Sequence, residues 1–358
     1  MTRLLVCAGL GGVGKTTTSA ALALRCAQEG DRVVVLTIDP ARRLADALGV
    51  ERLGNEPVPV PLDAPGTLHA LMLDRKATWD EVIRRYAPSD EIRDRLLGNR
   101  YYEQVSTRLG GSQEYMANEK LYQLVQSGAW DVVVLDTPPA RQTVEFFRAP
   151  ERMRGVFDQR VLEGLLRPSK GLLAMAGRRV TGLLRRIAGD HVLGDIAEFF
   201  SLTTGLSAGF RERHRAVHEW LHDRERTGYY LVTAARNTQS HDVREFLGVL
   251  EGRQMRLAGF FVNRTTRDPG LVEPIAELQP PAGVEGVVWG RALDGLVASA
   301  AAQRREARRE GEEAAALVRS HGQVPVWMIP DLGEEVRDLR GLTLLARFLP
   351  PSPATVIA

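Results

Sequence analysis

Short apolar runs alternate with longer segments of helical spacing along much of this 358-residue chain. An apolar run over 4–8 precedes a glycine-rich stretch, residues 15–29 follow with alanine and leucine at helical spacing, and a second apolar run covers 32–38. This order predicts a strand, a helix and a second strand, which together form a βαβ unit. Strands that are apolar throughout are typical of a sheet buried on both faces. We therefore expect an α/β fold with a doubly wound, mostly parallel sheet.

Later parts of the chain repeat the strand pattern but also depart from it. Two stretches, about 79–126 and 150–226, read as wholly helical and predict helical insertions in a single domain over 1–349. A further helix is expected over 296–320, and the proline-rich residues 350–358 predict a disordered tail. Additional strands are predicted at 67–73, 132–135, 229–233, 257–262, 286–288 and 324–328.

The second helical stretch contains an amphipathic and basic segment over 170–187. The simplest interpretation is a helix whose apolar face packs on a neighbour. The alternative is a groove for an apolar client, such as a membrane-protein segment, or a face that touches a membrane. Leucine, alanine and methionine faces that would line such a groove lie at 162–166, 172–175 and 183–187.

Composition narrows the possible partners. The 47 basic and 45 acidic residues give a formal charge of +2, too little to collect nucleic acid non-specifically. Cys7 and Cys26 are the only cysteines, so a disulfide framework and a cysteine-rich zinc site are excluded. With no signal peptide and no apolar run of about 18 residues, we expect a cytoplasmic protein, with peripheral membrane contact as an alternative.

The glycine-rich stretch matches the phosphate-binding loop pattern G-x-x-x-x-G-K-[ST] between the first strand and its helix. In such a loop the backbone N–H groups and the helix N-terminus hold phosphates. Lys15 would reach the β- and γ-phosphates, and the Thr16 hydroxyl would bind Mg²⁺. The candidate nucleotide-binding residues here are Gly11, Gly12, Val13, Gly14, Lys15, Thr16 and Thr17.

A dinucleotide-binding fold is the competing interpretation, because Gly9, Gly11 and Gly14 also fit G-x-G-x-x-G and Asp39 ends the second strand. Lysine and threonine directly after the last glycine disfavour it, since that position packs helix on strand. A second acid-ended strand, closing at Asp136, has the form of a Walker B strand whose carboxylate orients the Mg²⁺ shell. The pattern therefore favours a P-loop NTPase.

Three blocks together resemble the ArsA-type ATPases, which comprise the arsenite-pump ATPase and the tail-anchored-protein targeting ATPase. They are the loop at 11–17, Thr-Ile-Asp-Pro-Ala at 37–41 and Asp-Thr-Pro-Pro at 136–139. The resemblance spans nearly the whole chain and implies a dimeric P-loop ATPase that uses ATP and Mg²⁺. It is strongest with actinobacterial members that lack the family's first loop lysine and occur beside a paralogue that keeps it.

The resemblance also implies roles for single residues. Asp39 would orient the attacking water as a catalytic residue together with Lys15, and Asp136 would hold Mg²⁺ through water. Phe-Phe-Val-Asn-Arg at 260–264 is similar to the segment that the family places against adenine, which adds Asn263 and Arg264 to the nucleotide site. The two switch segments would comprise Asp39, Pro40, Ala41, Asp136, Thr137, Pro138, Pro139 and Arg141.

Departures from the family pattern change what we expect of the ATPase rate, the partner subunit and the metal sites. Leu10 stands where the family has a lysine that reaches the partner's phosphates, and Arg141 is a candidate replacement for that charge. No C-x-x-C pair or cysteine trio is present, so no zinc or arsenite site is expected. The sequence thus predicts an ATP-hydrolysing dimeric switch, slow when alone and paired with a paralogue. A nucleotide-dependent regulatory scaffold with little ATPase activity remains the alternative, and a partition or division-site ATPase is a third class.

Overall fold

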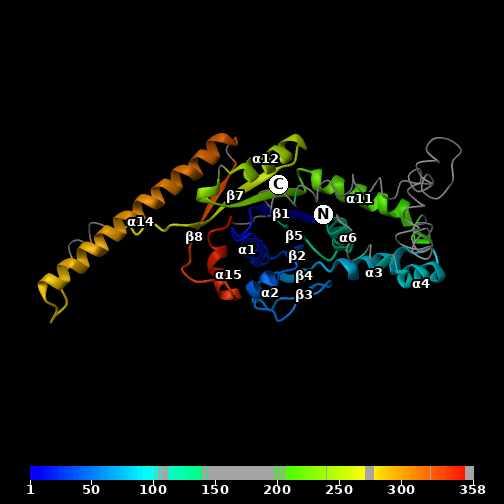
Figure 1. Ribbon diagram of the computed structural model, residues 1–358, viewed down its shortest axis with the longest axis horizontal. Coiled ribbons are helices and arrows are strands. Elements are labelled where there is room, and N and C mark those ends of the chain that lie inside the picture. The colour runs from blue at the N-terminus through cyan, green and yellow to red at the C-terminus, as the bar shows by residue number, and fades with distance from the viewer. Residues whose placement is uncertain are drawn as a thin grey trace, which may run out of the picture.

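The computed structural model describes residues 1–100, 102–103, 106, 112–138, 143, 198–199, 202–203, 206–238, 240–270, 278–322 and 324–350. Within this part of the chain, one sheet forms the centre of the molecule (Figure 1). Helices lie on both of its faces, and the long helix α14 projects beyond one side.

The sheet has the strand order β3-β4-β2-β5-β1-β6-β7-β8. Every neighbouring pair is parallel except β3 and β4, which are antiparallel. The predicted mostly parallel, doubly wound sheet is therefore confirmed. Its strands are β1 (Arg3–Gly9), β2 (Arg32–Thr37), β3 (Val58–Pro59), β4 (Thr67–Met72), β5 (Val132–Asp136), β6 (Thr227–Ala234), β7 (Leu257–Thr265) and β8 (Val326–Pro330).

The helices connect these strands and extend the fold at its two ends. Helices α3, α4 and α11 extend from one end of the sheet, while α14 projects from the opposite end (Figure 1). The described helices are α1 (Lys15–Gln28), α2 (Arg43–Leu48), α3 (Arg75–Tyr86), α4 (Asp90–Gly98), α6 (Ser112–Gln126), α11 (Ser207–His222), the 3₁₀ turn η2 (Ala235–Asn237), α12 (His241–Gly252), α14 (Gly286–Ser320) and α15 (Leu339–Ala346).

The side chains of β1 point alternately to the two faces of the sheet, so they pack into two separate layers of the core. Leu4, Val6 and Ala8 join the apolar cluster that includes α3, α6, α11 and α12. Leu5 and Cys7 face the opposite cluster, which includes α1, α2 and α15. Successive side chains of a strand point to opposite faces, so a strand that is apolar at every position must be covered on both. Because β1 is packed on both faces, its carboxyl end is held in place, and the glycine-rich loop starts from that end.

One predicted strand is wrong. Residues 286–288 begin the 35-residue helix α14 instead. Val287 and Val288 are 69% and 57% exposed, so neither valine packs in the sheet. Three residues carry too little periodicity to separate a strand from a helix start, and the helical pattern continues without a break to Ser320. The two-residue edge strand β3 was not predicted, since it is too short to leave a pattern.

The first predicted helical stretch, 79–126, contains α4, α6 and most of α3. Most of the second, about 150–226, lies outside the described residues, as do the amphipathic segment 170–187 and residues 351–358. Of that second stretch, α11 is described, and it packs beside α6. No described helix combines the length and the apolar character that a membrane crossing requires.

Candidate functional site

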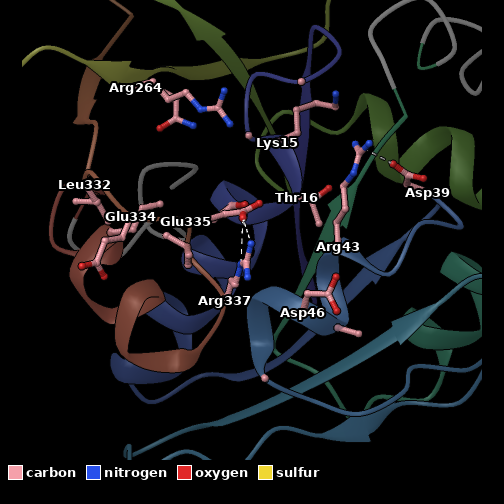
Figure 2. A pocket seen from close by; sticks show the side chains of 18 of the residues that line it. Lys15, Thr16, Asp39, Arg43, Asp46, Arg264, Leu332, Glu334, Glu335 and Arg337 are labelled. Atoms are coloured by element: carbon pink, nitrogen blue, oxygen red, sulfur yellow. Dashed lines mark hydrogen bonds and ion pairs between the residues drawn. The ribbon is translucent and has the colours of Figure 1, made fainter.

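A cavity of about 890 Å³ lies at the carboxyl edge of the sheet. Because the strands that surround it are parallel, their carboxyl ends meet at this edge, where ligands of open α/β sheets usually bind. Four segments supply most of its walls: the glycine-rich loop, the start of α2 and the turn after it, the end of β7, and residues 330–332 and 334–337 at and after the end of β8 (Figure 2). Asp39, Thr137 and Leu345 complete the lining.

Backbone geometry explains the glycines of the loop. Gly12 and Gly14 have φ angles of +76° and +90°, which side chains other than glycine rarely adopt. Gly9 needs space instead, since a Cβ there would lie 2.0 Å from the carbonyl oxygen of Val232. The helix α1 begins directly after the loop at Lys15, so its first N–H groups point toward the cavity region. Such a helix start favours a bound anion.

Asn263 joins the end of β7 to this loop. Its side-chain Nδ2 donates a 2.8 Å hydrogen bond to the carbonyl oxygen of Val13. A Cβ on Gly14 would lie 2.3 Å from the same nitrogen, so the strand and the loop are in close contact. Asn263 is 7% exposed. It therefore holds the loop in addition to lining the cavity.

Lys15 lies at the start of α1 and folds back over the loop. Its Nζ donates a 2.7 Å hydrogen bond to the carbonyl oxygen of Leu10. Burial lowers the pKa of Lys15, while the carboxylates of Asp136 and Asp39 act in the opposite direction. The lysine is thus a partly desolvated cation between two acids, beside the N-terminus of a helix.

Asp136 ends β5 and is fully buried. It accepts hydrogen bonds from the Thr37 hydroxyl at 2.8 Å and from the Ser19 hydroxyl at 3.2 Å. Burial raises the pKa of Asp136, and hydrogen bonds from Thr37, Thr16 and Ser19 together with the Lys15 charge oppose that rise. Carboxylate and hydroxyl oxygens are the donors that Mg²⁺ prefers, so Thr16 and Asp136 fit a magnesium site.

The segment after β2 carries Asp39 into the cavity wall. The Asp39 N–H donates to the Thr37 hydroxyl oxygen, and the Asp39 carboxylate accepts the Ala41 N–H at 3.0 Å. These contacts form a short turn between β2 and α2. The Asp39 side chain is 30% exposed and lies 3.6 Å from the guanidinium of Arg43. A solvent-accessible carboxylate at this place can accept a hydrogen bond from water.

The structure brings most predicted site residues to this cavity. Val13 is directed into the apolar core, and Asp136 is buried behind the wall. Pro40 and Ala41 line a smaller neighbouring cavity of about 200 Å³. Pro138 is buried, whereas Pro139 and Arg141 lie outside the described residues. The predicted residues that line the main cavity are Gly11, Gly12, Gly14, Lys15, Thr16, Thr17, Asp39, Thr137, Asn263 and Arg264.

Sequence reasoning missed three parts of the site. The wall at 330–337 follows the last strand and carries no motif that would assign it. Arg43 adjoins the predicted first switch and could have been found by its charge. Gln113, at the start of α6, donates through Nε2 to the carbonyl oxygen of Ile38 at 2.7 Å. That bond links a helix outside the sheet to the residue before Asp39, a contact that no local pattern reveals.

Comparison with known proteins agrees with this arrangement. The family model described as anion-transporting ATPase matches residues 2–269. A protein named ATPase GET3 from Malassezia globosa is 34% identical over 146 residues, which cover 41% of this chain and 42% of that protein. A putative arsenical pump-driving ATPase from Chlorobaculum tepidum is 32% identical over 155 residues, or 42% of this chain and 36% of that protein. The matched segments therefore span less than half of these relatives' length.

Proposed function

Because this chain belongs to the anion-transporting ATPase family, we propose that it binds ATP with Mg²⁺ and hydrolyses the nucleotide as a molecular switch. One observation carries the proposal: Lys15, Thr16 and Asp39 line a single cavity at the start of a helix. The cavity offers backbone donors and the Lys15 cation for phosphates, hydroxyl and carboxylate oxygens for a metal, and an accessible carboxylate for water.

Each group has a part in the proposed hydrolysis. The loop N–H groups and Lys15 bind the β- and γ-phosphates and hold them in place. Thr16 and, through water, Asp136 hold Mg²⁺, which neutralises phosphate charge when bound. Asp39 accepts a hydrogen bond from the attacking water and orients it toward the γ-phosphorus. Asn263 and Arg264 border the part of the cavity next to residues 330–337, where the base and ribose would lie.

The contacts of the first switch suggest how nucleotide state would reach the rest of the molecule. The turn at Asp39 is bonded to Thr37, whose hydroxyl contacts Asp136, and the preceding Ile38 is held by Gln113 of α6. A movement of this turn would strain those bonds and shift α6 relative to the sheet. We propose that the helical segments 79–126 and 150–226 present the client or effector surface, and that the client is apolar.

We further propose that the working form is a dimer with a paralogous ATPase subunit in the cytoplasm, the alternative location being peripheral at a membrane. The observation behind the dimer is Leu10, an apolar residue in the phosphate loop that is partly buried against both core layers. The partner would supply a loop lysine to this site. The same Leu10 favours the second candidate, a nucleotide-dependent regulatory scaffold with little ATPase activity.

Binding and turnover of ATP by the purified full chain test the proposal. Binding of a fluorescent ATP analogue and phosphate release are measured for the native chain and for Lys15→Ala, with Lys76→Ala on α3 as a control outside the cavity. Loss of binding or turnover in Lys15→Ala alone supports the ATPase. Binding without any turnover supports the scaffold, and absence of binding contradicts both.

Native mass spectrometry of the chain purified with Mg²⁺ and ATP tests the dimer. Two different subunits, the second carrying a lysine at the position of Leu10, would support the paralogue pair. A homodimer with bound nucleotide would contradict it and would place any compensating charge within this chain.

A further inference from the structure

The phosphate end of the cavity has little positive charge for the ligand that we propose it takes. ATP carries about four negative charges on its phosphates, and Mg²⁺ neutralises only part of them. Among the described residues that line the cavity, the cations are Lys15, Arg43, Arg264 and Arg337. Arg337 forms an ion pair with Glu335, and Arg264 follows Asn263 at the end of β7. Lys15 and Arg43, whose contact with Asp39 is longer at 3.6 Å, remain for the phosphates.

Arg43 is placed to act there. It is the first residue of α2, and its guanidinium lies 3.6 Å from the Asp39 carboxylate. Figure 2 shows this guanidinium beside Asp39, on the side of the cavity where Lys15 lies. The two cations and Asp39 thus share one end of the cavity.

Ordinary helix energetics do not explain an arginine at this position. A cation in the first turn of a helix is disfavoured by the helix dipole. The Arg43 side chain is 67% exposed, so it contributes little packing. Its neighbour Arg42 takes a different direction and lines the smaller cavity beside Met72 and Asp74. Of these two adjacent arginines, only Arg43 lines the main cavity.

Building on the function proposed above, we propose that Arg43 is a catalytic residue that supplies a positive charge to the γ-phosphate from within the chain. In the reaction the water oxygen forms a bond to the γ-phosphorus while the bond to the β,γ-bridging oxygen breaks. The electron pair of that bond leaves with ADP. One water hydrogen stays on the attacking oxygen, and the other is transferred to another oxygen of the released phosphate. Arg43 takes no part in these bonds and stabilises the charge that spreads over the γ-phosphate oxygens.

The contact with Asp39 gives Arg43 a second role, which is to control when the Asp39 carboxylate is available to water. In the present structure the guanidinium is paired with the carboxylate that would orient water. When the guanidinium moves to the γ-phosphate, the Asp39 carboxylate is released to accept the water hydrogen bond. Asp39 lies in the turn between β2 and α2, and Arg43 is the first residue of α2 directly after that turn, so one rearrangement there would position both groups.

The test compares three variants of the full chain, Arg43→Ala, Arg43→Lys and the adjacent control Arg42→Ala. The rate of ATP hydrolysis in a single turnover is expected to fall about 10³-fold or more in Arg43→Ala, in line with other arginines at phosphoryl-transfer sites. Affinity for ATP is expected to change less than about threefold, because the charge matters most in the transition state. Arg43→Lys should recover part of the rate, since it keeps the charge but lacks the planar fork. Arg42→Ala should hydrolyse ATP at the native rate.

A binding measurement avoids dependence on turnover. Native protein with Mg²⁺, ADP and aluminium fluoride should retain the nucleotide longer than with ADP alone, because the fluoride complex mimics the transferring phosphoryl group. Arg43→Ala should bind ADP normally and lose that extra retention. If Arg43→Ala hydrolyses ATP or retains the fluoride complex as the native chain does, the role of Arg43 is wrong while the ATPase stands. If the native chain binds no nucleotide, the ATPase proposal itself fails.

Discussion

The Thr37 hydroxyl donates a 2.8 Å hydrogen bond to the buried carboxylate of Asp136. The contact joins the ends of β2 and β5, which are neighbours in the sheet, and the same hydroxyl oxygen accepts the Asp39 N–H. A buried carboxylate needs such partners, because burial without hydrogen bonds strongly disfavours the charged form. Thr37 therefore links the candidate metal residue to the candidate water-orienting residue.

Replacing Thr37 by valine should destabilise the fold. The change keeps the side-chain shape but removes a donor to a charged group, which corresponds to about 2 kcal/mol of the free energy of unfolding. Urea denaturation of the native chain, Thr37→Val and Thr37→Ser measures it. Thr37→Ser keeps a hydroxyl, so its free energy of unfolding should lie between those of the native chain and Thr37→Val. A native free energy of unfolding in Thr37→Val would show that the hydrogen bond contributes nothing to stability.

Asp136→Asn should separate stability from metal binding. Burial raises the pKa of Asp136 above its unfolded value, so the folded state binds this proton more tightly than the unfolded state. Its contribution to stability is present below the unfolded pKa and is lost as pH rises through the folded pKa. At neutral pH the asparagine variant should therefore be at least as stable as the native chain, and its advantage should shrink in acid. Mg²⁺-dependent ATP binding should fall. Thermal unfolding across acid and neutral pH, together with a magnesium titration, checks both parts, and a strongly destabilised variant at neutral pH would contradict the argument.

Gly14→Ala should disrupt the loop, and Gly11→Ala serves as its control. Alanine at position 14 would be strained at φ +90° by about 1–2 kcal/mol, and its Cβ would collide with the Asn263 amide. Nothing lies within 4 Å of a Cβ at Gly11. We expect a lower free energy of unfolding only for Gly14→Ala, so Gly11→Ala is a control for stability alone, because Gly11 also lines the cavity. Nucleotide binding should weaken in Gly14→Ala. Adding Asn263→Ala should relieve the collision but not the strain, so a non-additive double-mutant cycle is expected.

The thiol of Cys7 should be inert in the folded protein. Burial raises its pKa to about 12, from 9.0 in the absence of the fold. Alkylation by iodoacetamide near neutral pH should therefore be slow until a denaturant is added, since the thiolate is the reactive form. Because the unfolded chain releases this proton first, stability should fall as pH rises above about 9. Cys7→Ala should reduce that fall, and rapid alkylation of the native protein would contradict the burial argument.

The buried ion pair between Arg213 and Glu119 should be important to the contact between α11 and α6. The Arg213 Nε donates to the Glu119 carboxylate at 2.7 Å, and both residues are almost completely buried. Arg213→Met removes the arginine partner of Glu119 and leaves only the 3.4 Å contact with His214 Nε2, which should lower the free energy of unfolding by about 3–5 kcal/mol. The exposed pair of Arg236 and Glu306 provides the control, because its contact is 3.5 Å long and Arg236→Met should leave the denaturation midpoint close to native.

Much of this fold could be predicted from local pattern. Strands such as β1 and β2 are apolar at nearly every position, and that signal identifies a sheet covered on both faces. Length limits the method: β3 has two residues, and the apolar start of α14 resembles a strand until the following turns are considered. The state of β3 depends on its pairing with β4, whereas that of α14 is decided by the helical turns that follow directly.

The candidate site also has a part that local sequence pattern predicts and a part that it does not. The glycine loop, Asp39 and Asp136 could be predicted because each follows an apolar strand in a recognisable order. The bond from Gln113 to Ile38 crosses 75 positions, and the cavity wall at 330–337 comes from the last strand. Contacts of this kind arise from the order of strands in the sheet, which a single sequence does not state.

The bond between Asn263 and Val13 has a consequence for how the molecule acquires its site. The two residues are 250 positions apart, and β1 reaches β7 only through β6. As the chain is synthesised, the glycine loop is completed among the first residues, but its tether arrives only when β7 has been added. The phosphate loop therefore reaches its final shape late, after the central strands have paired, and a chain truncated before β7 would carry the loop's sequence without the contact that holds it.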